Sequence, residues 1–460
     1  MNILVINGSP AGDNSITLQT VLYIQKYFSK HNFEFINAGQ TIRQIEKDFS
    51  ASRKAIEAAD LLVFCYPVYT FLVPAQLHRF IELMKEAGMD LSDKFATQIT
   101  TSKHFYDTTA HQFIDDNCAD LGLRYINGLS ADMEDLLHKK GRKEALSFFH
   151  HVLWTIKRGY AKDSAVVFTR ALSHARSPLS CAYVPERAQA PSDKARIAIV
   201  ADLAKGDRAL RDMIFRFMAV CNYKCSLINI HDFPFAGGCL GCFHCASDGK
   251  CVYNDGFEEL LRERIQTADA CVYAFTIKDH SMGYRFKLFD DRQFCNGHRT
   301  VTMGKPVGYI INGVLSAEPN LRTLIEARAQ VGGNHLAGIA ANESRADQEI
   351  DQLSDELSYA IRHHYSQPAN FYGVGGLKIF RDLIWQMQGL MREDHRFYKA
   401  HGFYDFPQKK KGTVLGMYAV GALMHNRKLQ KKLGANMTEG MLMPYKKVLE
   451  QVTIPVTQDK

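Results

Sequence analysis

Four cysteines gather in one short segment of this chain and could hold an inorganic centre. Cys239, Cys242 and Cys245 are each separated by two residues, and Cys251 follows after five more. Three thiolates at this spacing can surround a small core, and a fourth can complete its coordination, as compact spacings do in iron–sulfur proteins. The pattern favours an iron–sulfur cluster. A structural zinc ion more often uses two separated pairs, and plain structural or redox-active thiols are a third interpretation.

A second candidate site lies near the N-terminus, where a glycine-containing loop follows an apolar run. Residues 8–17 read GSPAGDNSIT, with hydroxyl side chains at both ends and glycines that let a ligand come close to the backbone. The loop stands between an expected strand and an expected helix. Unpaired N–H groups at a helix start can hold a phosphate without any basic side chain. The expected phosphate contacts are Ser9, Pro10, Asn14, Ser15 and Thr17.

The loop after the third expected strand could bind the rest of such a ligand. In an open, doubly wound sheet, ligands lie beyond the carboxyl ends of the strands, where the strand order reverses. Pro67 stiffens this loop, and Tyr69 and Phe71 offer flat apolar surface that suits stacking on an isoalloxazine ring. The residues expected to contact a flavin here are Tyr66, Pro67, Val68 and Tyr69.

The elements that position these sites follow one pattern twice. An apolar run at 3–6 and another at 196–200 each begin an alternation of strands and amphipathic helices, and a polar, Pro-containing stretch at 185–194 separates the two. Such alternation predicts a parallel, doubly wound sheet in each segment. The matched element order, with TADACVY at 267–273 against AADLLVF at 58–64, favours a tandem duplication. Two unrelated α/β domains or one large sheet are the alternatives.

Beyond residue 367 the pattern changes to helices with a basic surface. Residues 371–460 hold fifteen Lys and Arg against seven Asp and Glu. This tail could rest on an acidic protein or an anionic membrane, although basic runs most often form a solvated face. The segment Gly373–Gly376 is predicted to be a turn before a helix, because it lacks the last glycine of a dinucleotide fingerprint. The predicted domains are therefore 1–184, 195–366 and a helical extension at 367–460.

Composition limits the class of protein. The chain has 460 residues, 46% of them hydrophobic and 23% charged, and no apolar run approaches the roughly 20 residues that cross a bilayer. Its start shows no secretory signal, and its eleven cysteines are an odd number, so we expect a cytoplasmic protein with reduced thiols and no transmembrane segment. Nucleic-acid binding is not expected, because no recognised binding fold is visible.

The N-terminal motifs resemble the NADPH-dependent FMN reductase branch of the flavodoxin-like superfamily. The resemblance covers about residues 1–150 and is carried by NGSP at 7–10, the later part of that loop, YPVY at 66–69 and QL at 76–77. It implies FMN as the cofactor, two flavodoxin-like sheets with strand order 2-1-3-4-5, and a third flavin loop at Thr101 and Ser102. Ala11 and Ile16 stand where that family often has Arg and Asn.

The cysteine spacing resembles that of the iron–sulfur flavoproteins, relatives of the same branch. This resemblance implies a [4Fe–4S] cluster beside FMN, with Cys239, Cys242, Cys245 and Cys251 as its ligands. The second domain has lost its own flavin loop, since the acidic Asp202 and Asp207 would repel a phosphate. In those relatives, flavin and cluster meet across a subunit interface. We therefore expect either a homo-oligomer or an internal pseudo-dimer that pairs FMN of the first domain with a cluster in the second.

These observations predict an FMN-dependent NAD(P)H oxidoreductase. Electrons would pass between NAD(P)H or ferredoxin and an acceptor, with the flavin supplying two-electron and the cluster one-electron chemistry. The alternatives are a non-enzymatic electron carrier that docks an acidic protein partner and a flavin-based redox sensor. An enzyme needs an open cavity over the flavin, whereas a carrier needs only an exposed flavin edge. The sequence identifies no catalytic residue.

Overall fold

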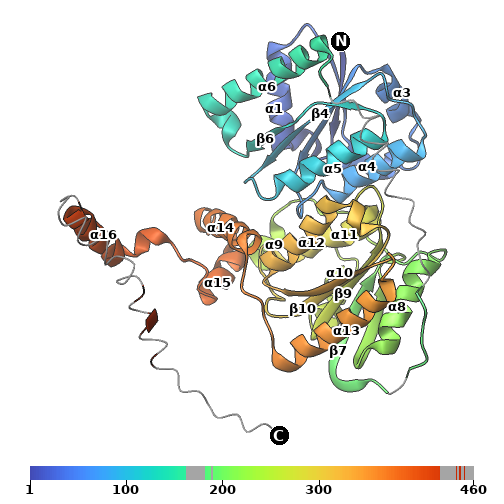
Figure 1. The fold of residues 1–460 in the computed structure, drawn as a ribbon. Helices are drawn as coiled ribbons and strands as arrows, with labels where there is room; N and C mark the ends of the chain where they lie inside the picture. The colour runs from blue at the N-terminus through green and yellow to red at the C-terminus, as the bar shows by residue number, and fades with distance from the viewer. Residues whose placement is uncertain (162–181, 188–189, 425–441, 443–444, 447–449, 451–460) are drawn as a thin grey trace. The chain divides into compact units, whose positions relative to one another are not determined.

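The computed structural model describes residues 1–161, 182–187, 190–424, 442, 445–446 and 450. Backbone contacts group Met1–Tyr398 into one compact unit and Lys399–Lys460 into another. The first unit holds two parallel β-sheets, each covered by helices (Figure 1).

The first sheet has the strand order β2-β1-β3-β4-β5, and β6 pairs with the far end of β4. Its strands are β1 (Asn2–Asn7), β2 (Asn32–Ile36), β3 (Leu61–Pro67), β4 (Phe95–Ser102), β5 (Arg124–Tyr125) and β6 (Leu129–Asp132). The helices of this domain are α1 (Ile16–Tyr27), α2 (Ala38–Ile45), α3 (Ser50–Ala58), α4 (Ala75–Glu86), α5 (Asp107–Asp120) and α6 (Lys139–Arg158). Side chains of α1 and α6 cover one face of the sheet, and those of α4 and α5 cover the other.

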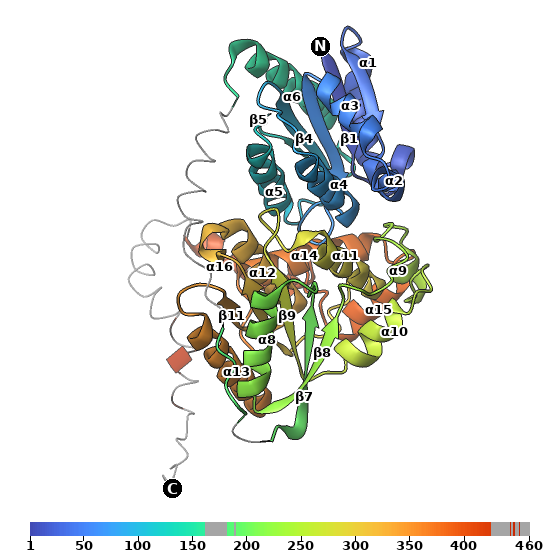
Figure 2. The same ribbon diagram turned by 90° about the vertical axis from the view of Figure 1, so that its right-hand side faces the viewer.

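The second sheet repeats the same order as β8-β7-β9-β10-β11. Its strands are β7 (Ser192–Ala201), β8 (Tyr223–Asn229), β9 (Ala270–Thr276), β10 (Pro306–Asn312) and β11 (His335–Ala341). The helices are α8 (Arg208–Val220), α9 (His244–Asp248), α10 (Phe257–Glu259), α11 (Gly283–Arg292), α12 (Pro319–Gly332) and α13 (Ala346–His363). Figure 2 shows α8 and α13 beside this sheet, and their apolar side chains form a core with one of its faces. The predicted order 2-1-3-4-5 is confirmed in both sheets.

The two domains share one hydrophobic core. Helix α4 packs against α11, and α5 packs against α12, so equivalent helices of the two sheets face each other. Buried side chains of both pairs belong to a single cluster that also includes Phe64 of β3 and Phe275 of β9. A contact made by equivalent surfaces has the arrangement of a two-fold symmetric dimer. The predicted internal pseudo-dimer is compatible with this packing.

Equivalent loops mirror each other across this core. In the loop before α4, Thr70 and Phe71 have φ angles of 38° and 71°, and in the loop before α11 Asp279 and His280 have φ angles of 52° and 59°. An N–H group in the first turn of each helix then donates to a carboxylate of the other domain. Ala75 N lies 2.8 Å from Asp291 Oδ2, and Tyr284 N lies 2.8 Å from Glu82 Oε1. Each domain therefore caps a helix of the other.

The described residues beyond α13 include the helices α14 (Phe371–Gln386), α15 (Arg392–Ala400) and α16 (Lys411–Met424). Helix α14 packs on α12. The predicted turn at Gly373–Gly376 is wrong, because these residues lie in the first turns of α14. A Cβ on Gly373 would lie 2.8 Å from the Gln330 carbonyl oxygen, so this glycine permits the close helix contact. Among the described residues, no helix has the length and apolar character needed to cross a membrane.

Candidate functional site

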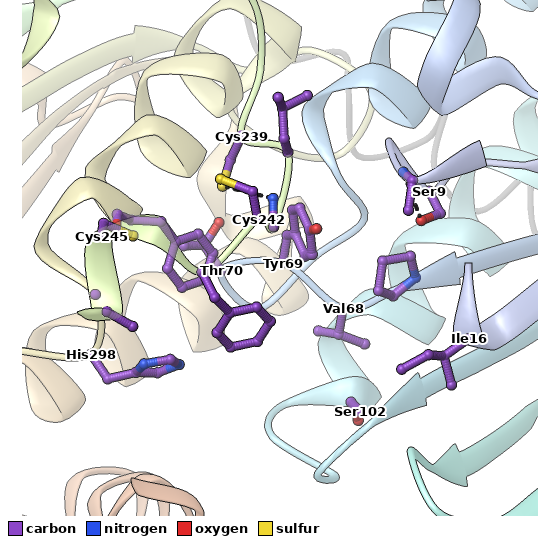
Figure 3. A pocket seen from close by; sticks show the side chains of 18 of the residues that line it. Ser9, Ile16, Val68, Tyr69, Thr70, Ser102, Cys239, Cys242, Cys245 and His298 are labelled. Carbon is purple, nitrogen blue, oxygen red and sulfur yellow. Dashed lines mark hydrogen bonds between the residues drawn. The ribbon is translucent and has the colours of Figure 1, made fainter. Parts of the chain in front are cut away.

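One cavity of about 380 Å³ collects side chains from both domains and from α14 (Figure 3). It lies at the carboxyl ends of the strands of the first sheet, where ligands of open α/β sheets bind. Most of the site residues predicted from the sequence line it: Ser9, Asn14, Ser15, Thr17, Pro67, Val68, Tyr69, Thr101, Ser102, Cys239, Cys242, Cys245 and Cys251. Two of the predicted flavin contacts, Pro10 and Tyr66, are not among the lining residues.

The phosphate loop is held in shape by the buried Asn7. Its side-chain nitrogen donates to Gly12 O at 2.9 Å, and its side-chain oxygen accepts from Ser9 N at 3.1 Å. Ser15 begins α1 as its N-cap residue, with its hydroxyl oxygen accepting from Leu18 N. The start of α1 therefore lies at the cavity with hydroxyl groups around it. Because the first N–H groups of a helix have no partner within the helix, this arrangement fits a phosphate group.

The phosphate loop and the loop at the end of β4 are joined by a contact between two threonines. The hydroxyl groups of Thr17 and Thr101 lie 2.6 Å apart, and both residues are buried. This contact joins the start of α1 to the end of β4, so the cavity floor is continuous from the phosphate loop to the third loop. The hydroxyl-rich floor and the apolar Val68 and Tyr69 beside it suit the polar chain and the flat ring of FMN, respectively.

A tight contact behind the phosphate loop gives a testable prediction. A Cβ on Gly39, in the first turn of α2, would collide with the main chain of Gly8 and Ser9. We expect Gly39→Ala to push this loop toward the cavity and to weaken FMN binding roughly tenfold or more, about 1.4 kcal/mol. Titration of apoprotein with FMN, followed by flavin fluorescence, measures this change.

The matched control is Gly206→Ala. A Cβ on Gly206 meets no atom within 4 Å, and its φ angle does not lie in the left-handed region. FMN affinity of this control should stay within about twofold of that of the unchanged protein. Equal affinity of the Gly39→Ala protein would show that this loop does not contact the cofactor.

The loop after β3, which contains Tyr69 and Phe71, differs in part from the prediction. The side chain of Tyr66 is fully buried in the core, where its hydroxyl group donates to Gln98 Oε1 at 2.5 Å. Tyr69 lines the cavity instead, and the two strained residues that follow it change the direction of the chain. Left-handed backbone at a β-branched or bulky residue persists only when its surroundings hold it there.

The second domain supplies the groups that hold this loop. Lys287, whose side chain is fully buried, donates to Tyr69 O at 2.9 Å and to Thr70 Oγ1 at 2.6 Å. It also forms an ion pair with the equally buried Asp291. The Asp291 carboxylate in turn accepts from Thr70 Oγ1 and from Ala75 N. A buried ion pair of α11 therefore fixes the position of the loop after β3, which is called the flavin loop below.

Figure 3 shows Cys239, Cys242 and Cys245 at the opposite end of the cavity from Ser9 of the phosphate loop. Cys251 also lines this cavity. No three of the four sulfur atoms lie within 4.8 Å of one another. A tetrahedral zinc site with 2.3 Å Zn–S bonds would bring its sulfurs to about 3.8 Å. The four sulfurs therefore do not form a closed zinc site in this structure.

The protonation of these thiols also bears on their role. Burial raises the pKa of Cys239, and burial together with the nearby Asp394 and Cys242 raises the pKa of Cys245 to about 11. A redox-active thiol needs a lowered pKa, so this environment disfavours a redox role for Cys239 and Cys245. It suits thiols that lose their protons when a metal centre binds.

The cysteine loop touches the flavin loop directly. Gln76 Nε2 donates to Cys239 O at 3.3 Å, and a Cβ on Gly241 would collide with the Tyr69 hydroxyl group. Gly241, with a φ angle of +62°, also donates its N–H to the Cys239 sulfur at 3.5 Å. Hydrogen bonds of this type tune the potential of sulfur-ligated iron. The loop that carries the cysteines therefore lies against the loop after β3, and both belong to the same compact unit of the chain.

A buried cation lies beside the sulfurs. Arg292 pairs with Asp255 at 2.7 Å, donates to Gly237 O at 2.9 Å and stacks over the Tyr253 ring. Its side chain is 1% exposed and lines the cavity. The guanidinium group, already paired with Asp255, would lie beside any metal centre that the four thiolates hold.

The equivalent of the phosphate loop in the second domain holds a carboxylate. Asp207 is the N-cap of α8, where its Oδ1 accepts from Leu210 N at 3.0 Å, and its Oδ2 is bonded to Thr276. The helix start that would bind a phosphate is thus already satisfied by an acidic side chain. Asp207 therefore occupies the place in the second domain that corresponds to the phosphate loop of the first.

The structure also brings residues to the cavity that the sequence did not single out. The imidazole of His298 points into the cavity, and Phe380 of α14 packs against it. His298 Nδ1 lies 3.0 Å from Oδ2 of the buried Asp394 on α15. The pair is separated by 96 residues, so no local sequence pattern joins them.

Comparisons with known proteins give the following similarities. Residues 1–115 match the model of the NADPH-dependent FMN reductase family. The chain is 25% identical over 174 residues to an iron–sulfur flavoprotein of Archaeoglobus fulgidus, which covers 36% of this chain and 79% of that protein.

Two solved structures are similar in fold. An FMN-dependent NADH-azoreductase from Bacillus anthracis, in complex with FMN, is 15% identical with a TM-score of 0.25, covering 33% of this chain and 98% of that one. An NAD(P)H:quinone oxidoreductase from Methanothermobacter marburgensis is 15% identical with a TM-score of 0.26, covering 32% of this chain and 89% of that one. The chain thus matches the NADPH-dependent FMN reductase family over its first 115 residues and is similar in sequence to an iron–sulfur flavoprotein.

Proposed function

We propose that this protein is an FMN-dependent oxidoreductase that passes electrons between NAD(P)H or ferredoxin and an acceptor through a [4Fe–4S] cluster. The observation that carries the proposal is the shared cavity, which is lined by the phosphate loop at one end and by four cysteines at the other. We place this activity in the cytoplasm, where thiols outside a cluster stay reduced.

Different residues around the cavity would bind the FMN phosphate, the FMN ring and the cluster. Ser9, Asn14 and Ser15 would hold the phosphate of FMN, and Val68 and Tyr69 would contact the ring. Cys239, Cys242, Cys245 and Cys251 would hold the cluster. FMN supplies hydride chemistry and the cluster supplies one-electron chemistry when they are bound.

An enzyme is favoured over a simple carrier by the form of the cavity. Beyond the flavin-loop residues it extends to a largely apolar region made by Phe294, Phe380 and Leu383. A carrier that exchanges electrons at an exposed flavin edge has no need of such a region. The apolar surface suits a flat organic acceptor.

The first experiment is an absorption spectrum of protein purified without oxygen, with iron and acid-labile sulfide measured on the same sample. We expect flavin bands, a broad visible absorption that dithionite bleaches, and about four irons per chain. Flavin without iron would leave an FMN reductase whose cysteines are structural. Protein that binds no FMN even after incubation with an excess would contradict the proposal.

A further inference from the structure

We propose that His298, oriented by Asp394, is the catalytic residue that transfers a proton to the acceptor reduced in this cavity. The inference rests on the proposed function, because it needs a flavin that delivers a hydride. It adds what the sequence did not supply, namely a group that can exchange a proton at the place where the acceptor binds.

The histidine is held in one orientation by three contacts. The Asp394 carboxylate lies 3.0 Å from His298 Nδ1 and 3.2 Å from its main-chain N–H, and the Tyr398 hydroxyl group donates to His298 O at 3.3 Å. The ring also packs edge-on against Phe380, with ring centroids 4.7 Å apart. An imidazole whose Nδ1–H donates to a carboxylate has a fixed tautomer and presents Nε2 on its other side.

The carboxylate that orients it is itself fixed and charge-balanced. Asp394 is fully buried, and its second oxygen accepts from Arg299 Nη1 at 3.2 Å. Gly297, with a φ angle of +61°, lets the backbone approach so closely that a Cβ there would collide with this carboxylate. Arg299 and the close backbone of Gly297 therefore fix the position of the Asp394 carboxylate.

The imidazole faces the cavity. His298 lines it, and its side chain is 14% exposed. Among the described residues no hydrogen-bond partner is found for Nε2, so this atom remains available to a ligand. Phe294 and Leu383 line the cavity as well and offer apolar surface to a flat acceptor.

The proton balance of the reaction requires such a group. A carbonyl acceptor that is reduced by two electrons gains a hydride, which reduced FMN would supply when bound, and one proton, which the imidazolium form of His298 would supply from Nε2. The carbonyl then becomes a hydroxyl group, and His298 is left as a neutral imidazole whose Nδ1–H stays bonded to Asp394. Solvent then returns the proton. An acceptor that takes single electrons without protons does not use this step.

The test compares two acceptors in the FMN-loaded, iron-containing protein. A water-soluble quinone needs both hydride and proton, whereas ferricyanide needs only electrons. We expect His298→Gln to slow NAD(P)H-dependent quinone reduction roughly a hundredfold or more and to change ferricyanide reduction by less than about twofold. His363→Gln, exposed at the end of α13, should change neither rate.

A second readout needs no turnover. In protein labelled with ¹⁵N-histidine, the neutral form of His298 should carry its proton on Nδ1, and Asp394→Asn should move that proton toward Nε2. An equal loss with both acceptors, or an unchanged quinone rate, would overturn the role of His298. Unchanged protein that binds FMN but reduces neither acceptor would instead overturn the proposed function, and this inference with it.

Discussion

Replacing Cys242 by Ser is expected to reduce the iron content from about four atoms per chain to less than one while FMN stays bound. Cys242 is the exposed member of the four clustered cysteines, so its loss should disturb the fold little. A cluster that loses one of four thiolates is left with an open position and becomes labile. Iron and sulfide assays, together with the flavin content of the same sample, measure the result.

The matched control is Cys225→Ser. Cys225 lies on β8, is also partly exposed and donates its thiol proton to Tyr223 O. It does not line the cavity, so iron and flavin contents should match those of the unchanged protein. A Cys242→Ser protein with its full iron content would remove Cys242 from the ligand set, and simultaneous loss of FMN would indicate a collapsed fold instead.

Replacing Lys287 by Met should lower the free energy of unfolding by about 3–5 kcal/mol, because it leaves the buried Asp291 carboxylate without its cation. The side chains of both residues are fully buried. The substitution also removes the donor to Tyr69 O, so the flavin loop loses a contact that holds its left-handed backbone. Urea unfolding, followed by circular dichroism, measures the change.

Two further variants distinguish the loss of stability in Lys287→Met from the loss expected for an exposed ion pair. The double variant Lys287→Met with Asp291→Leu removes the unpaired charge and should be more stable than the single variant, although it still lacks the carboxylate that caps α4. Arg53→Met breaks an exposed pair with Glu57, whose two side chains are each 49% exposed, and should cost less than about 1 kcal/mol. A loss below about 1 kcal/mol for Lys287→Met would mean that the buried ion pair does not stabilise the fold.

The sheet topology could be predicted because apolar runs and helical stretches alternate twice along the chain. The phosphate loop was visible for a similar reason, since its glycines and hydroxyl residues stand together between a strand and a helix. Tyr66 was assigned to the flavin site on the basis of its neighbours. In the structure Leu62, Phe64 and Tyr66 point to the same face of β3 and share the core. The strand is apolar on both faces, so its sequence does not show which side chains reach the cavity.

Other features were not accessible from the sequence. Lys287 and Asp291 are four residues apart on a helix, which is also the spacing of an ordinary surface ion pair. Only the packing of α4 against α11 buries them. His298 and Asp394 lie on separate elements and meet only because α15 folds back onto the second domain. Two residues that are far apart in the chain leave no pattern in the sequence that shows they will meet.

Because α4, α5, α11 and α12 share a core within one chain, the contact between the two domains does not depend on protein concentration. Two separate half-chains would associate with an affinity that depends on protein concentration, and their stability would fall on dilution. In one polypeptide the same contact forms at an effective concentration set by the chain itself. Dilution therefore does not separate the halves of the cavity, and a single molecule keeps the phosphate loop and the cysteine loop together at any expression level.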